Sequence, residues 1–88
     1  MAASVPVSNT PVSRGYLRWR CRRGMKELDV MLTRYLDVYF DAMNLEQRQQ
    51  FDCFLDEPDT RIWQWLLGRS VPQKPEYLYF VQRIRDLS

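Results

Sequence analysis

The stretch that decides the fold is Met25–Met43, MKELDVMLTRYLDVYFDAM. Its apolar residues follow the i, i+3, i+4, i+7 spacing; they are Leu28, Met31, Leu32, Tyr35, Leu36, Tyr39, Phe40 and Met43. This spacing places them on one face of an α-helix. Glu27 and Asp29 fall in the first turn, where the positive end of the helix dipole favours acidic side chains. We therefore predict a long amphipathic helix from about Met25 to Met43.

A shorter helix is predicted before this one, from about Arg14 to Arg23. Ser13 is a good N-cap for it, because its hydroxyl can accept from a backbone N–H of the first turn. Leu17 and Cys21 are four residues apart and share the apolar face. We expect Gly24 to end the helix in the left-handed position that follows a C-cap.

Positive charge is concentrated in this first helix. Six basic residues fall between Arg14 and Lys26, with no acidic residue among them. We expect Arg22 and Arg23 to lie in the last turn, where the helix dipole favours cations. Most of the arginines are expected to be solvated. The charge then reverses, since the segment from Glu27 to Asp59 holds nine acidic residues and two arginines.

A third helix is predicted to begin after Asn44. Asn44 and Gln47 have the spacing of a capping box, in which each side chain bonds the backbone of the other residue. The apolar side of this helix is formed by Phe51, Phe54 and Leu55. The helix is expected to end at the sequence Asp56-Glu57-Pro58.

Two more helices complete the prediction. Asp59 is expected to cap a short fourth helix that ends at Gly68. Its apolar residues are Ile62, Trp63, Trp65, Leu66 and Leu67, which we assign to the core. Pro75 suits the first turn of the last helix. The apolar stripe of that helix is Tyr77, Phe80 or Val81, Ile84 and Leu87.

The sequence thus predicts an all-α fold, a compact bundle of five short helices. Residues 13–88 form one all-helical domain, and residues 1–12 are expected to be a flexible tail, because they are rich in Ser, Pro and Val and carry no charged side chain. A chain of 88 residues buries about 60–65% of its unfolded surface, which suits one small core. We expect a monomer.

Composition excludes several kinds of site. The chain has no histidine, which excludes Cys/His zinc sites and imidazole acid–base chemistry. Asp56, Glu57 and Asp59 lack the spacing of a calcium loop and are interpreted as caps and solvated charge. Neither a nucleophile–base set nor a glycine-rich phosphate loop is found. We therefore expect no metal, no catalytic residues and no enzyme activity.

The two cysteines, Cys21 and Cys53, favour free thiols and a reducing compartment. We interpret Cys21 as a small packing residue. No apolar run approaches the ~20 residues that span a bilayer. The first residues lack the features of a secretory signal. We expect no membrane insertion and a bacterial cytoplasmic location.

The segment around Gly24 carries the main functional signal. Trp19–Asp29 reads WRCRRGMKELD and resembles the RGxxE proteins of the succinate dehydrogenase assembly and flavinylation factor family. The similarity is sharp in this segment and looser over the rest of Leu17–Leu87. Later residues that echo the family pattern are Asp59, Trp65 and Leu66.

The resemblance implies an assembly factor that binds the flavoprotein subunit of succinate dehydrogenase, with fumarate reductase as a second client. Such a factor promotes covalent attachment of FAD to a histidine of the partner. It holds no tightly bound cofactor of its own. The implied partner-binding residues are Trp19, Arg22, Arg23, Gly24, Met25, Glu27 and Asp29.

The same residues have purely structural interpretations. An arginine, a glycine and a glutamate are also what a helix end, a turn and a helix start require, so Arg23, Gly24 and Glu27 fit a turn, a binding surface or both. Trp19 could lie under the guanidinium of Arg22 or Arg23, or be half-buried against the following helix.

Two other functions stay open from the sequence. Proteins of the same family are also described as antitoxins, which implies a module that neutralises a membrane-associated toxin. The basic first helix, with its aromatic residues Tyr16 and Trp19, could bind nucleic acid weakly. We disfavour nucleic acid, because the acidic helices that follow would repel a polyanion.

Overall fold

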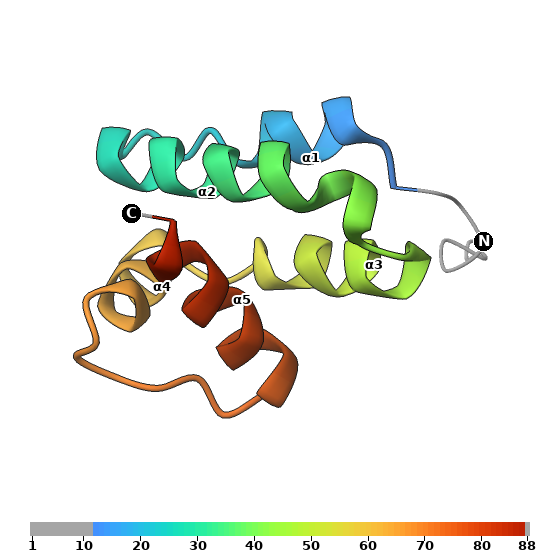
Figure 1. Ribbon diagram of the computed structural model, residues 1–88. Helices are drawn as coiled ribbons and strands as arrows, with labels where there is room; N and C mark the ends of the chain where they lie inside the picture. Colours follow the sequence, from blue (N-terminus) through green and yellow to red (C-terminus); the bar gives the residue numbers. More distant parts are fainter. Residues whose placement is uncertain (1–11, 88) are drawn as a thin grey trace, which may run out of the picture.

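The computed structural model describes residues 12–87, and they form five α-helices and one 3₁₀ turn (Figure 1). The elements are α1 (Arg14–Arg20), α2 (Lys26–Tyr39), η3 (Phe40–Ala42), α3 (Leu45–Phe54), α4 (Asp59–Leu66) and α5 (Pro75–Asp86). No strand occurs in these residues, so the all-α prediction is confirmed. Residues 1–11 of the expected tail lie outside the described residues. Val12, the last residue of that expected tail, packs against the core.

The helices are arranged with α1 and α2 on one side and the other three on the opposite side (Figure 1). Helices α1 and α2 run antiparallel and contact each other, joined by a loop of residues 21–25. Helix α5 contacts α2, α3 and α4. Helix α1 is therefore an outer element, and the loop that follows it lies at the periphery of the bundle.

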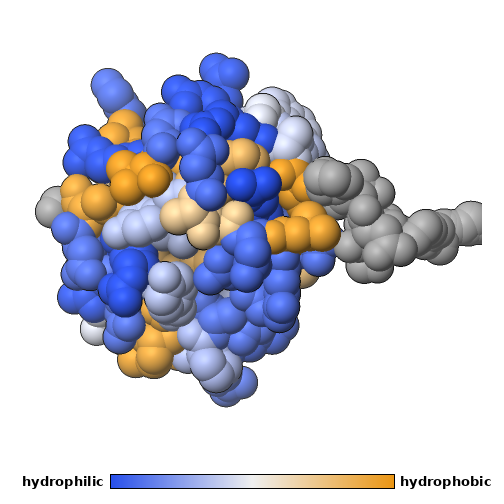
Figure 2. All heavy atoms as spheres, turned by 45° about the vertical axis from the view of Figure 1, so that its right-hand side comes forward, coloured by the Kyte–Doolittle hydropathy of each residue, from blue (hydrophilic) through white to orange (hydrophobic). Residues whose placement is uncertain are grey.

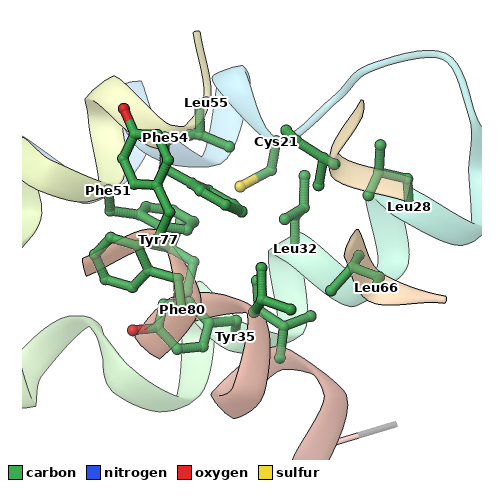
Figure 3. Packing of buried hydrophobic residues seen from close by; sticks show 14 of the residues in the cluster. Cys21, Leu28, Leu32, Tyr35, Phe51, Phe54, Leu55, Leu66, Tyr77 and Phe80 are labelled. Atoms are coloured by element: carbon green, nitrogen blue, oxygen red, sulfur yellow. The ribbon is translucent and has the colours of Figure 1, made fainter. Parts of the chain in front are cut away.

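The core is built from most of the predicted apolar residues (Figure 3). The core assignment of Leu67 is wrong: it is 42% exposed, because it is the C-cap beyond the last turn of α4. Aromatic rings dominate its centre: the ring centroids of Phe51 and Phe80 are 5.4 Å apart, and those of Phe54 and Phe80 are 5.6 Å apart. Leu17 and Cys21 bring α1 into this core and are completely buried. Trp65 is buried, as the predicted core role requires, and Trp63 packs at the edge.

The face shown in Figure 2 is mostly polar. Figure 2 shows hydrophilic side chains over most of one face, with apolar side chains in small separate patches. The helices that form the bundle are thus amphipathic, as their spacing predicts. The monomeric state stays a prediction.

Several predicted caps are confirmed. The Ser13 hydroxyl accepts from the Tyr16 N–H at 3.1 Å. Asn44 and Gln47 form the capping box, with N···O distances of 2.8 and 3.0 Å. Gly68 follows α4 with φ +77°, and Pro75 opens α5. The local sequence rules for capping therefore predicted these four helix ends correctly.

The predicted end of the first helix is wrong. Helix α1 ends at Arg20, and Cys21 is its C-cap. Arg22, Arg23 and Gly24 lie in the loop, so Gly24 does not occupy the position after the C-cap. The physical reason is a contact with the next helix, since the Asp29 carboxylate accepts the Arg23 N–H at 2.6 Å and this bond requires the chain to leave the helix.

The second helix is also shorter than predicted. It begins at Lys26, with Met25 as N-cap, and its end tightens into η3 before Met43. The Arg48 guanidinium donates to the Phe40 carbonyl at 2.9 and 3.2 Å, and this carbonyl therefore has a partner outside an α-helical ladder. The apolar face still reaches Met43, which is buried.

Candidate functional site

The loop between α1 and α2 is closed by the first turn of α2. Asp29 Oδ1 accepts the Arg23 N–H at 2.6 Å, and Asp29 Oδ2 accepts the Gly24 N–H at 3.4 Å. A carboxylate in the first turn of a helix is also stabilised by the helix dipole. Asp29 therefore holds the backbone at Arg23 and Gly24 in one conformation.

Gly24 has a backbone conformation that only glycine adopts easily. Its φ is +90°, in the region where a Cβ is strained. A Cβ placed on Gly24 would meet nothing within 4 Å, and the residue is exposed. The glycine is thus required by the backbone turn, and the space above it is open to a partner.

Arg23 points inward, to the turn between α3 and α4. Its Nε donates to Asp59 Oδ1 at 2.6 Å, its Nη1 to the Leu55 carbonyl at 2.6 Å and its Nη2 to the Glu57 carbonyl at 2.7 Å. The side chain is 12% exposed. Most donors of Arg23 are therefore used within the protein.

The same contact corrects the prediction for Asp59. Asp59 is the first residue of α4, and Pro58 is the N-cap, with no side-chain capping bond. The Asp59 carboxylate bonds Arg23 instead of the backbone of its own helix. Asp59 thus forms an ion pair with Arg23, 36 positions away in the sequence, instead of a local cap.

The expectation that most of these arginines are solvated holds for Arg14, Arg18 and Arg22, which remain substantially exposed. It is wrong for Arg20 and Arg23, whose side chains are 19% and 12% exposed. The sequence did not indicate the aspartate partners. Arg14 pairs with Asp41 at 3.0 Å, Arg18 pairs with Asp37, and Arg20 pairs with both Asp52 and Asp56 at 2.6 Å. With Arg23, four of the six basic residues between Arg14 and Lys26 have an aspartate partner. These pairs lower the free positive charge that nucleic acid binding would need.

Trp19 stands out from the surface. It is 68% exposed, and its nearest aromatic neighbour is Tyr16, with ring centroids 6.4 Å apart. Both structural predictions for Trp19 are wrong: it is not half-buried, and no described guanidinium stacks on it. Arg23 cannot reach the Trp19 ring because its guanidinium is held by Asp59 and the carbonyls beside it.

Arg22 and Glu27 are exposed near Gly24. Within residues 12–87, neither side chain has a hydrogen-bond or ion-pair partner. Met25 is half-buried and packs against the core. The seven predicted residues therefore divide in two: Trp19, Arg22, Gly24 and Glu27 are exposed, whereas Arg23, Met25 and Asp29 are partly buried.

Two shallow hollows flank Trp19. One has a volume of about 480 Å³ and is lined by Trp19, Arg22 and the paired side chains of Arg20, Arg23, Asp56 and Asp59. The other has a volume of about 400 Å³ and lies between Gly15, Arg18 and Thr33, again beside Trp19 and Arg22. Trp19 and Arg22 line both hollows.

The thiols are free. Cys21 is buried and Cys53 is exposed. Burial raises the pKa of Cys21 to about 12, so the neutral thiol packs in the core, as predicted (Figure 3).

No cluster of three or more His, Cys, Asp or Glu side chains in residues 12–87 could hold a metal ion. None of the described helices is long and apolar enough to cross a bilayer.

Comparison with known proteins shows that the chain belongs to the family described as the flavinator of succinate dehydrogenase. The family model matches residues 16–88. A relative from Coxiella burnetii, the FAD assembly factor SdhE, is 36% identical over 80 residues, covering 91% of this chain and 98% of the relative. A Xylella fastidiosa protein of the same name is 38% identical over 85 residues, covering 97% and 88%. No solved structure matches the chain.

These findings confirm the resemblance based on the Trp19–Asp29 segment. The relatives are named assembly factors, which agrees with the prediction that the protein is not an enzyme. The sequence did not indicate the role of Arg20, Asp52 and Asp56. Their pairing spans 32 and 36 residues, and no local spacing rule relates them.

Proposed function

We propose that this protein binds the flavoprotein subunit of succinate dehydrogenase and promotes covalent attachment of FAD to that subunit. Membership of the flavinator family and the names of the relatives support this function. The accepting histidine would belong to the partner, since this chain has none. The protein would act as a chaperone-like assembly factor, with no FAD site of its own.

One observation carries the assignment of the surface. Trp19, Arg22 and Glu27 are exposed within five residues of Gly24 in the chain, and Trp19 and Arg22 line the same hollows. Asp29 holds the backbone at Arg23 and Gly24 between them. A surface that is ordered before binding loses less conformational entropy in the complex. We propose these exposed residues, with Met25 at their edge, as the contact surface for the flavoprotein.

The proposed mechanism is positional. By binding one conformation of the flavoprotein, the factor would keep FAD and the accepting histidine aligned, and alignment alone can lower a reaction barrier by several kcal/mol. The Glu27 carboxylate has no partner in the described chain and would be available as an acceptor for a donor of the flavoprotein.

The experiment is covalent flavin fluorescence of the flavoprotein in a denaturing gel, from cells that lack this protein. Wild type should restore the signal, and Gly24→Arg should not, because bulk and backbone strain at φ +90° would block docking. Gly68→Ala is the control, since it strains a second left-handed glycine far along the chain. Full fluorescence in cells without any complement would remove the flavinylation function.

We extend the proposal to fumarate reductase as a second client, to a monomeric factor and to the bacterial cytoplasm. The two free thiols support a reducing compartment. Purified fumarate reductase flavoprotein would be tested for binding beside the succinate dehydrogenase subunit. Sedimentation of the free factor and of each mixture gives the oligomeric state and the stoichiometry.

A further inference from the structure

Arg20 lies outside the RGxxE segment, yet it makes as many inward contacts as Arg23. Its Nη1 donates to the carbonyl and the carboxylate of Asp52, at 2.9 and 2.6 Å. Its Nη2 donates to the Leu55 carbonyl at 3.2 Å and to Asp56 Oδ1 at 2.6 Å. The side chain is 19% exposed. Arg20 is therefore fixed by four acceptors of another element.

These acceptors lie at the C-terminal end of α3. Leu55 is the C-cap of α3, and Asp52 is in its last turn. The last carbonyls of a helix lack intrahelical donors and carry the negative end of the dipole, so a guanidinium there is doubly stabilised. Arg20 supplies those donors from a different helix and thereby ties the end of α1 to the end of α3.

Arg20 and Arg23 share this position. The Leu55 carbonyl accepts from Arg20 Nη2 at 3.2 Å and from Arg23 Nη1 at 2.6 Å. Arg23 Nη1 also lies 3.4 Å from the Arg20 carbonyl. The two arginines thus meet at one atom, and moving one of them would disturb the other. We call Arg20, Arg23 and their α3–α4 acceptors the clamp.

The charge of Arg20 is permanent. Burial by itself lowers the pKa of Arg20, but hydrogen bonds and charges of Asp52 and Asp56 together raise the pKa above its ordinary value. Removing the guanidinium would take the donor from the Asp52 carbonyl and from part of two carboxylates, while the Leu55 carbonyl would keep only its bond from Arg23. The Arg20 guanidinium therefore remains a charged donor of the clamp.

Helix α1 packs on α2 and pairs with it through Arg18–Asp37, whereas Arg20 attaches its last turn to α3. It has seven residues, and Leu17 is its one buried residue, with Cys21 buried at the C-cap. Helices this short are unstable alone and depend on tertiary contacts. Trp19 precedes Arg20 and is exposed on the outer side of the same turn. The clamp on the inner side therefore sets where the outer side chain stands.

We propose that Arg20 is a positioning residue for partner binding, which with Arg23 holds the last turn of α1 and the following loop on the end of α3. By this contact it fixes the position of Trp19 and Gly24 for the flavoprotein. The inference rests on the proposed function, because the partner is the one proposed above. Arg20 itself does not contact the partner.

The test measures binding and loop position separately. The dissociation constant is measured with the FAD-loaded flavoprotein subunit for wild type, Arg20→Gln and Arg20→Lys. In the free protein, the Trp19 indole and Gly24 amide resonances report the loop. Arg14→Gln is the matched control, because it removes an arginine–aspartate pair of the same helix that touches no carbonyl of α3.

Arg20→Gln should weaken binding about tenfold, as expected for the loss of charge-assisted hydrogen bonds. It should also shift both loop resonances, and Arg20→Lys should restore part of each change. Asp56→Asn, which keeps Arg20 and removes one acceptor, should act in the same direction and replaces Arg20→Gln if that variant does not fold. Arg14→Gln should leave both readouts unchanged.

Three results would overturn the inference. One is wild-type affinity in Arg20→Gln. Another is weakened binding with unmoved loop resonances, which would make Arg20 a contact residue. The last is an equal effect of Arg14→Gln. Absence of binding by the wild type would instead refute the proposed function, and the resonances of the free variants would still decide whether the clamp positions the loop.

Discussion

The inner and outer faces of the segment Trp19–Asp29 differ in what their polar groups do. On the inner face, Arg20 and Arg23 donate to carbonyls and carboxylates of the same chain. On the outer face, Arg22 and Glu27 have no partner in the described residues. Arg22 and Arg23 are neighbours in sequence and of one residue type, but the structure gives them opposite surroundings.

The difference teaches that one short segment can carry two tasks. A guanidinium with buried acceptors contributes to the stability of the fold, because its removal leaves polar groups unpaired. An exposed guanidinium contributes little to folding, and its energy is available for a partner. Substitutions on the two faces should therefore separate loss of stability from loss of binding.

The largest effect is expected for Arg23→Gln. Losing the bonds to Asp59, Leu55 and Glu57 should reduce the free energy of unfolding by about 3 kcal/mol, as for a broken partly buried ion pair. Arg22→Gln should change it by less than about 0.5 kcal/mol. Urea denaturation followed by circular dichroism measures both. Equal stabilities of the two variants would contradict the assignment of a structural inner face and a binding outer face.

A smaller loss of stability is expected for Gly24→Ala. The alanine must adopt φ +90°, which should cost about 1–2 kcal/mol. Gly68→Ala, at φ +77°, is the control with a similar strain. Thermal unfolding should be lowered comparably in both variants, whereas flavinylation should fall only in Gly24→Ala. Equal flavinylation in the two variants would argue against a special role of the Gly24 loop.

Glu27→Gln should alter function without altering stability. Because the carboxylate is exposed and has no partner within residues 12–87, the free energy of unfolding should change by less than about 0.5 kcal/mol. Covalent flavin fluorescence should nevertheless decrease in cells that carry this variant. A large loss of thermal stability would instead show that Glu27 serves mainly to start α2.

The smallest effect is expected at the thiols. The pKa of Cys21 is raised to about 12 by burial, so its folded-state thiol stays protonated at pH 8 and is shielded from reagents. Alkylation with iodoacetamide should modify exposed Cys53 and leave Cys21 intact until the protein unfolds. Mass spectrometry of peptides gives both extents. Rapid labelling of Cys21 would show that α1 separates easily from the core.

Much of the fold could be predicted from local sequence chemistry. The periodicity of Leu28 to Met43 gave the central helix, and the Asn44 and Gln47 capping box was correct because both groups lie within one turn. The end of α1 was missed, since it depends on Asp29 and on acceptors near Leu55. Pairing across 32–36 residues leaves no periodic trace in the chain.

The candidate site was predicted as a set but without its division into faces. The family resemblance selected the seven residues around Gly24. It could not say that Arg23 turns inward while Arg22 turns outward, because adjacent positions of a loop differ only by backbone angles and tertiary partners. The 68% exposure of Trp19 was missed for the same reason, because helical spacing does not say how far a side chain stands out into solvent.

The most direct test is amide hydrogen exchange of the protein with and without the FAD-loaded flavoprotein subunit. Binding through the outer face predicts new protection at residues 19–29, centred on Gly24 and the first turn of α2. The exposed surface of α5 should exchange as in the free protein. Protection confined to α5, with residues 19–29 unchanged, would contradict the proposed contact surface.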